Sequence, residues 1–155
     1  MTETMTENFW GEIPKVDKAR TPLSILKEQA AMLGQLSNRL LEGEIAFGKS
    51  GTTHEIDAFL RIVAPSLGGY SIDIIRIIYD MKIYPLRLTK LLEGNLEEGY
   101  EYIIILNEEE FIGSLKAILS SDKVKRIISS LLIQIKSGDF DFSLKKEKDD
   151  EDIPF

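Results

Sequence analysis

The most reactive side chains in this 155-residue chain gather around its one histidine. His54 is followed closely by Glu55 and Asp57, and Lys82 lies further along the chain. One imidazole and two carboxylates are too few for a structural zinc site, which takes four ligands. Two acids and a lysine can serve metal-dependent hydrolysis, but this spacing does not put an acid and the lysine on one strand. We therefore predict no catalytic site, no metal site and no cofactor.

The second candidate for chemistry is the end of the printed sequence, where acids precede an apolar peptide. The last seven residues are Asp149, Asp150, Glu151, Asp152, Ile153, Pro154 and Phe155. Proline fixes its own φ and biases the preceding residue toward extended geometry, so the two apolar side chains are partly presented before a partner binds. With the chain ending here, Phe155 carries a carboxylate beside its ring. Such a peptide suits an apolar pocket with a basic rim.

These seven residues resemble the C-terminal acidic tip of bacterial single-stranded DNA-binding proteins, which typically has several Asp followed by Ile-Pro-Phe. Glu151 stands where that family usually has Asp. Lys145, Lys146 and Lys148 interrupt the preceding segment, where the family tends to have a longer Gly-, Gln- or Pro-rich linker. The resemblance implies that the tip docks on enzymes of DNA replication, recombination or repair and does not itself bind DNA.

Two arginines form another candidate binding site. If the turn between strands 55–64 and 70–79 is centred on Gly68-Gly69, positions whose numbers sum to 137 face each other. Arg61 then lies directly opposite Arg76, and Asp57 opposite Asp80. Like charges in this position are unfavourable unless they point into water, are neutralised by acids or share an anion.

Neutralisation by the nearby acids is the simpler interpretation of this pair. The alternative is an anion or single-stranded DNA site, with Phe59 and Tyr79 or Tyr84 nearby for base stacking. An odd number of residues in the turn would remove the basis of both interpretations, because it would change which residues face each other.

Composition narrows the classes of partner. The chain is 43% hydrophobic, contains no cysteine and has a formal net charge of −7. Seven acids and three lysines lie between Asp139 and Phe155, so this stretch alone holds −4. Nucleic acid is therefore not favoured as a partner, since its binding would need a local basic patch on the rest of the chain. No apolar run approaches the ~18 residues of a membrane span, and we expect a cytoplasmic protein with no membrane partner.

Apolar spacing predicts the elements that must position these residues. A helix is expected over 22–42, opened by Thr21-Pro22 and ended by Gly43. Strands are expected at 45–49, 55–64, 70–79, 84–89 and 100–106. Asn107 caps a further helical region that is broken or capped again at 120–122 and stops at Gly138.

The predicted fold class is α+β, with an N-terminal helix, an antiparallel meander of about four or five strands, and C-terminal helices packed on the sheet. Residues 1–20 form a lead-in segment whose Trp10 we expect to pin it to the core. Residues 21–138 form a single α+β domain, and residues 139–155 a flexible acidic tail with the docking tip.

The leading functional hypothesis is a non-enzymatic interaction protein. Its tip would recruit, or compete for, the DNA-maintenance enzymes that bind the tips of single-stranded DNA-binding proteins. The first alternative is a divergent single-stranded DNA-binding protein with the same tail, although the body lacks the sequence pattern of that family's OB domain. The second alternative is a domain of another function with an incidental acidic tail.

Overall fold

The computed structural model describes residues 6–16, 20–49, 53–92 and 101–140. This part of the chain forms α1 (Pro22–Leu36), β1 (Glu42–Phe47), β2 (Ile56–Ala64), β3 (Tyr70–Tyr79), β4 (Leu86–Lys90), β5 (Tyr102–Ile105), α2 (Glu108–Leu119) and α3 (Asp122–Ser137). A short 3₁₀ turn, η1 (Pro65–Leu67), joins β2 to β3. The predicted α+β class is confirmed.

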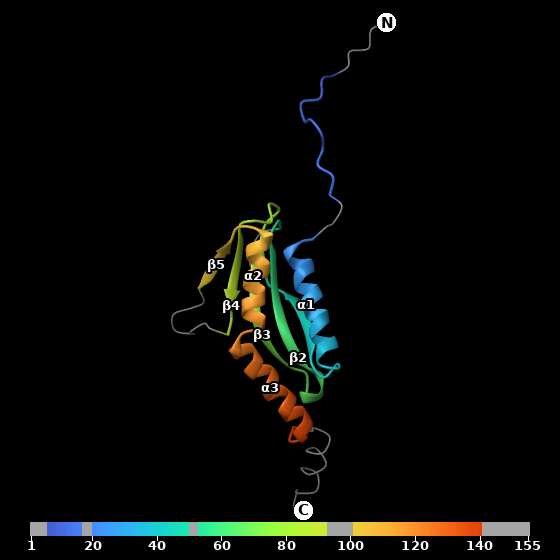
Figure 1. The fold of residues 1–155 in the computed structure, drawn as a ribbon, viewed down its shortest axis with the longest axis vertical. Coiled ribbons are helices and arrows are strands. Elements are labelled where there is room, and N and C mark those ends of the chain that lie inside the picture. The colour runs from blue at the N-terminus through green and yellow to red at the C-terminus, as the bar shows by residue number, and fades with distance from the viewer. Residues whose placement is uncertain (1–5, 17–19, 50–52, 93–100, 141–155) are drawn as a thin grey trace, which may run out of the picture.

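The sheet is an antiparallel meander in the order β1-β2-β3-β4-β5. All three helices lie on one face of it, which leaves the molecule with two layers (Figure 1). Side chains alternate between the faces along each strand. Residues such as Leu60, Ile77 and Leu88 therefore face the helices and are buried, while Phe59 and Arg76 lie on the opposite face, which we call the open face.

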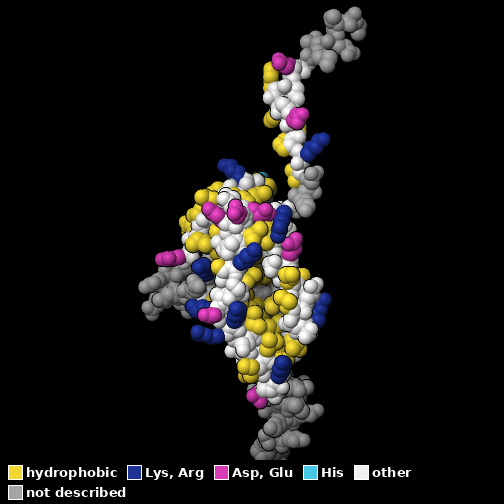
Figure 2. Space-filling model, in the orientation of Figure 1, with side chains coloured by type: hydrophobic (Ala, Val, Ile, Leu, Met, Phe, Trp, Pro, Cys, Tyr) yellow, Lys and Arg dark blue, Asp and Glu magenta, His cyan; other side chains and the backbone are white. Residues whose placement is uncertain are grey.

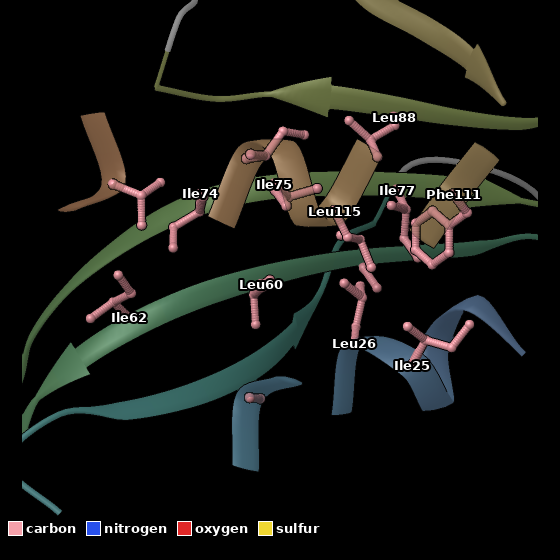
Figure 3. Close-up of a cluster of buried hydrophobic side chains, with 14 of the residues drawn as sticks. Ile25, Leu26, Leu60, Ile62, Ile74, Ile75, Ile77, Leu88, Phe111 and Leu115 are labelled. Atoms are coloured by element: carbon pink, nitrogen blue, oxygen red, sulfur yellow. The ribbon is translucent and has the colours of Figure 1, made fainter. Parts of the chain in front are cut away.

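The core fills the space between the sheet and the helices (Figure 3). Leu26 from α1, Ile75 and Ile77 from β3, and Phe111 from α2 are all fully buried. Burial of one such side chain contributes about 1.5–3 kcal/mol relative to leaving it exposed. The apolar residues that alternate along the strands thus pack into the same core as the apolar residues spaced by three and four along the helices.

The first helix is shorter than the sequence predicts. It ends at Leu36, where Ser37 is the C-cap and its hydroxyl donates to the carbonyl of Leu33 at 2.8 Å. Asn38 and Arg39 follow with positive φ and turn the chain into β1. Gly43 does not end the helix but lies within β1, so the predicted boundary at residue 42 is wrong.

Packing explains why a glycine is needed in β1. A Cβ atom on Gly43 would overlap the backbone of Ala30 in α1, lying 2.5 Å from its carbonyl oxygen. The absence of a side chain therefore lets α1 approach the strand at backbone distance. The sequence predicts Gly43 as the end of the helix, but this glycine lies where the helix and the strand contact each other.

The C-terminal helices follow the predicted signals. Asn107 caps α2 by accepting a hydrogen bond from the backbone N–H of Glu110 at 2.8 Å. α2 ends at Leu119, Ser121 caps α3, and Gly138 ends α3 with a left-handed φ of 74°. The predicted interruption at residues 120–122 is confirmed.

The lead-in does not behave as expected from its aromatic residues. Phe9 and Trp10 are 86% and 84% exposed, so the expectation that Trp10 pins this segment to the core is wrong. Thr21 enters α1 with extended geometry, φ −99° and ψ 161°. Residues 6–16 extend away from the body, beyond the end where α1 begins (Figure 1).

Candidate functional site

The predicted docking tip, Asp149–Phe155, lies outside the described residues. The described chain reaches Phe140, two residues beyond the left-handed Gly138 that ends α3. α3 therefore ends before the acidic segment begins. In the described part of the chain, none of the buried core residues lies beyond Leu131.

The register of the β2–β3 hairpin differs from the prediction and separates the two arginines. Ala64 pairs with Tyr70, which leaves a turn of odd length, five residues. A bulge between Leu60 and Arg61 then shifts the register once more. The turn alone places Arg61 opposite Asp73, and the bulge then places Arg76 opposite Phe59, so the predicted arginine–arginine pair is wrong.

Arg76 is instead held by Asp57, the one buried acid among the described residues. Its Nε and Nη2 donate to Oδ1 and Oδ2 of Asp57, both at 2.8 Å, in a bidentate pair. The Asp57 side chain is only 2% exposed, and a Cβ on neighbouring Gly48 would overlap its carboxylate. The hydrogen bond to Asp57 raises the pKa of the Arg76 guanidinium, against the opposing effect of burial.

The open face continues this pairing across the strands. Arg76 also stacks over the Phe59 ring, 5.2 Å from its centroid, and Arg61 donates to Asp73 at 2.9 Å. Arg87 lies over the ring of Tyr102, 5.9 Å from its centroid, and 3.8 Å from the carboxylate of Glu55. Each of these arginines thus has an acid partner, and two of them also have an aromatic partner.

Other residues expected beside the arginines lie elsewhere. Asp80 accepts a hydrogen bond from the backbone N–H of Lys82 at 2.8 Å within the turn after β3, so neutralisation of the arginines involves Asp57 and Asp73 instead. Tyr79 is buried on the helix side of the sheet. The pKa of the Tyr84 hydroxyl is raised by burial, with smaller contributions from the charges of Glu108 and Tyr79.

His54 and Glu55, two of the reactive side chains that are close in the sequence, lie in different surroundings. His54 is exposed in the turn before β2, and Glu55 contributes to the Arg87 pair. Within the described residues, no three His, Asp or Glu side chains come together closely enough to hold a metal ion. Nor does the part of the chain described here contain a helix long and apolar enough to cross a membrane.

Two apolar grooves on the helix side were not predicted from sequence. One, of about 520 Å³, lies between the β2–β3 turn and α3, with Tyr70, Leu131 and Phe140 among its lining residues. The other, of about 790 Å³, lies between α1 and the α2–α3 pair, and we call it the α1–α2 groove. The spacing of apolar residues in the sequence predicts that these side chains lie in the core. It does not show how far apart two helices lie on a sheet, so it could not predict the grooves.

No family model, no curated protein and no solved structure matches this chain. Its function is therefore inferred from its own residues. On the open face, Arg61, Arg76 and Arg87 are each paired with a described acid, and on the helix side the two grooves expose mainly apolar surface.

Proposed function

We propose that this protein is a non-enzymatic interaction protein. Its peptide Asp149–Phe155 docks on DNA-maintenance enzymes that recognise the tips of single-stranded DNA-binding proteins. One observation carries the proposal: four acids lead directly into Ile-Pro-Phe at the end of the printed sequence. The ring of Phe155 fills an apolar pocket, its carboxylate meets a basic group, and the acids face a basic rim.

The described body supports a binding role for the tail over one for the sheet. Arg61 and Arg76, the arginines of the alternative anion site, are engaged by Asp73 and Asp57. The charge of each arginine is thus already balanced by a carboxylate, which weakens the attraction of the pair for an incoming phosphate. Recruitment of an enzyme and competition for it use the same contact, so one binding experiment tests both.

The experiment changes Phe155 in two opposite ways. Deleting Phe155 removes the ring, and adding a few residues after it keeps the ring but moves the terminal carboxylate away. Because the contact requires both groups, we expect each change to weaken binding to a tip-recognising enzyme by more than about 30-fold, the loss of an anchor worth ~2 kcal/mol. Isothermal titration calorimetry with the purified enzyme measures the effect.

A charge variant serves as the matched comparison. Replacing Asp149, Asp150 and Glu151 by their amides should weaken binding less and flatten its salt dependence, since rim charges act through screened attraction. Undiminished binding of the extended protein would reject the proposal, as would failure of the unmodified protein to bind any such enzyme.

A second candidate, binding of single-stranded DNA by the body, has one specific observation in its favour. Tyr102 is 56% exposed on the open face, next to Arg87, so a base could stack on its ring. Titration of a labelled oligonucleotide separates the two candidates. If the body binds DNA in this way, R87A/Y102A should lose that binding while tip-dependent enzyme binding persists.

A further inference from the structure

The segment before α1 exposes an unusual amount of apolar surface. We call residues 7–16 the N-terminal arm. Its four large apolar side chains, Phe9, Trp10, Ile13 and Val16, are between 69% and 86% exposed. Figure 2 shows this segment standing clear of the body. A cluster of this kind on a chain segment that touches nothing is typical of an interaction site.

Part of the arm is locally ordered. The side-chain oxygen of Asn8 accepts from the backbone N–H of Trp10 at 2.9 Å, and its amide group donates to the carbonyl of Gly11 at 2.9 Å. Gly11 has a φ of +66°, which other residues adopt at a cost. The turn therefore holds Phe9 and Trp10 in a defined presentation before any contact is made, which lowers the entropy cost of binding.

The α1–α2 groove has the complementary character. Its walls include Ile112, Leu119 and Ile128, which are only partly buried. Figure 2 shows apolar side chains gathered between the helices on this side of the molecule. A groove of about 790 Å³ with such walls can accept aromatic side chains.

The α1–α2 groove is more basic than the one beside α3, whose only charged lining residue among those described is Arg126. The charged lining residues of the α1–α2 groove are Arg20, Lys116 and Lys125, with no acid among them. Neither lysine has a carboxylate within 4 Å among the described residues, while Arg20 lies 3.6 Å from Glu28 and 3.9 Å from Glu108. The arm carries Glu7 and Glu12 on either side of its aromatic pair, and its one base, Lys15, lies near its end, beyond Ile13.

We propose that the arm of one copy binds in the α1–α2 groove of a second copy, with its acids facing Lys116 and Lys125. Arm and groove belong to the same chain, and the arm extends away from α1 and α2, the helices on either side of its own groove (Figure 1). The stretch from Phe9 to Val16 spans at most ~28 Å, enough to run along the ~22 Å of α1. Reciprocal exchange of two arms closes a twofold dimer and leaves neither surface exposed.

The only tryptophan, Trp10, reports directly on this contact. The full-length protein should be a dimer by sedimentation velocity at high concentration and dissociate on dilution. The Trp10 emission should shift to longer wavelength over the same concentration range, because the indole leaves an apolar groove for water. If the protein is a monomer at all concentrations, the proposal is overturned, whether Trp10 is exposed or lies in the groove of its own chain. A dimer in which Trp10 is as exposed as in the unfolded protein also overturns it.

A charge swap tests the partner surfaces. K116E/K125E and, separately, E7K/E12K should each weaken the dimer about tenfold, and the combination of all four changes should restore most of the affinity. The control K27E/K123E changes two exposed lysines outside the groove and should leave affinity unchanged. All these positions are exposed, so the fold tolerates the changes. Equal effects of the groove and control variants, or no restoration, would overturn the assignment. None of these results depends on the C-terminal tip.

Discussion

At the scale of single residues, the open face contains two arginine–carboxylate pairs with very different surroundings. Asp57 is buried and receives two hydrogen bonds from Arg76, whereas Asp73 and Arg61 are both about one-third exposed. Exposed pairs contribute little to stability, because water and salt screen them. The loss of one partner from a buried pair is costly, because the other group keeps its desolvation penalty.

This contrast predicts different outcomes for two similar substitutions. D57N keeps the shape of the side chain but removes the charge that Arg76 faces, and we expect the free energy of unfolding to fall by about 2 kcal/mol, less than for a fully buried pair because Arg76 is partly exposed. D73N should cost less than about 1 kcal/mol. Urea unfolding followed by circular dichroism measures both. Equal losses of unfolding free energy in the two variants would mean that the burial of Asp57 does not increase the contribution of its pair to stability.

At the scale of elements, the sequence predicted the order and type of every helix and strand in the described part, but not their contacts. Alternation and capping residues are local signals, so the meander and the caps at Asn107 and Gly138 could be recognised. The five-residue turn and the bulge at Leu60/Arg61 have no such signal: the turn places Arg61 opposite Asp73, and the bulge places Arg76 opposite Phe59. The predicted arginine pairing was wrong because pairing depends on register, and one residue more or less in the turn changes it.

The contact between α1 and β1 gives a prediction at this scale. G43A places a methyl group against the backbone of Ala30, and backbone cannot rotate away as a side chain can. We expect a loss of about 2 kcal/mol or more in the free energy of unfolding, the usual cost of overpacking. Thermal and urea unfolding of the purified variant measure it.

Gly113 is the matched control for that change. It lies inside α2 with open space where a Cβ would be. G113A should therefore be neutral or stabilise the protein by up to about 1 kcal/mol, because alanine favours helix more than glycine does. If G43A is tolerated as well as G113A, α1 does not need its close approach to β1.

At the scale of the whole molecule, folding and the proposed docking function are carried by different parts of the chain. The buried apolar residues of the described part lie between Ile25 and Leu131. Residues 141–155 add six acids and three lysines, so they hold −3 of the net charge of −7. Stability should therefore depend on the first part and solubility on both.

Removal of residues 141–155 tests this separation. We expect the free energy of unfolding to change by less than about 0.5 kcal/mol, as for surface changes that remove no core contact. Urea unfolding by circular dichroism is the appropriate measurement, with the full-length protein as reference. A loss of several kcal/mol would show that these residues contribute to the packed body.

The meander order also determines how the chain can fold. Every strand pairs with a neighbour in sequence, and α1 and α2 adjoin β1 and β5, the strands next to them in the chain. Loop closure is therefore inexpensive at each step, and the sheet can grow one hairpin at a time. Low contact order favours rapid folding compared with β-sandwiches of similar size. During synthesis, α1 and the β1–β3 hairpins can assemble before the C-terminal helices have left the ribosome.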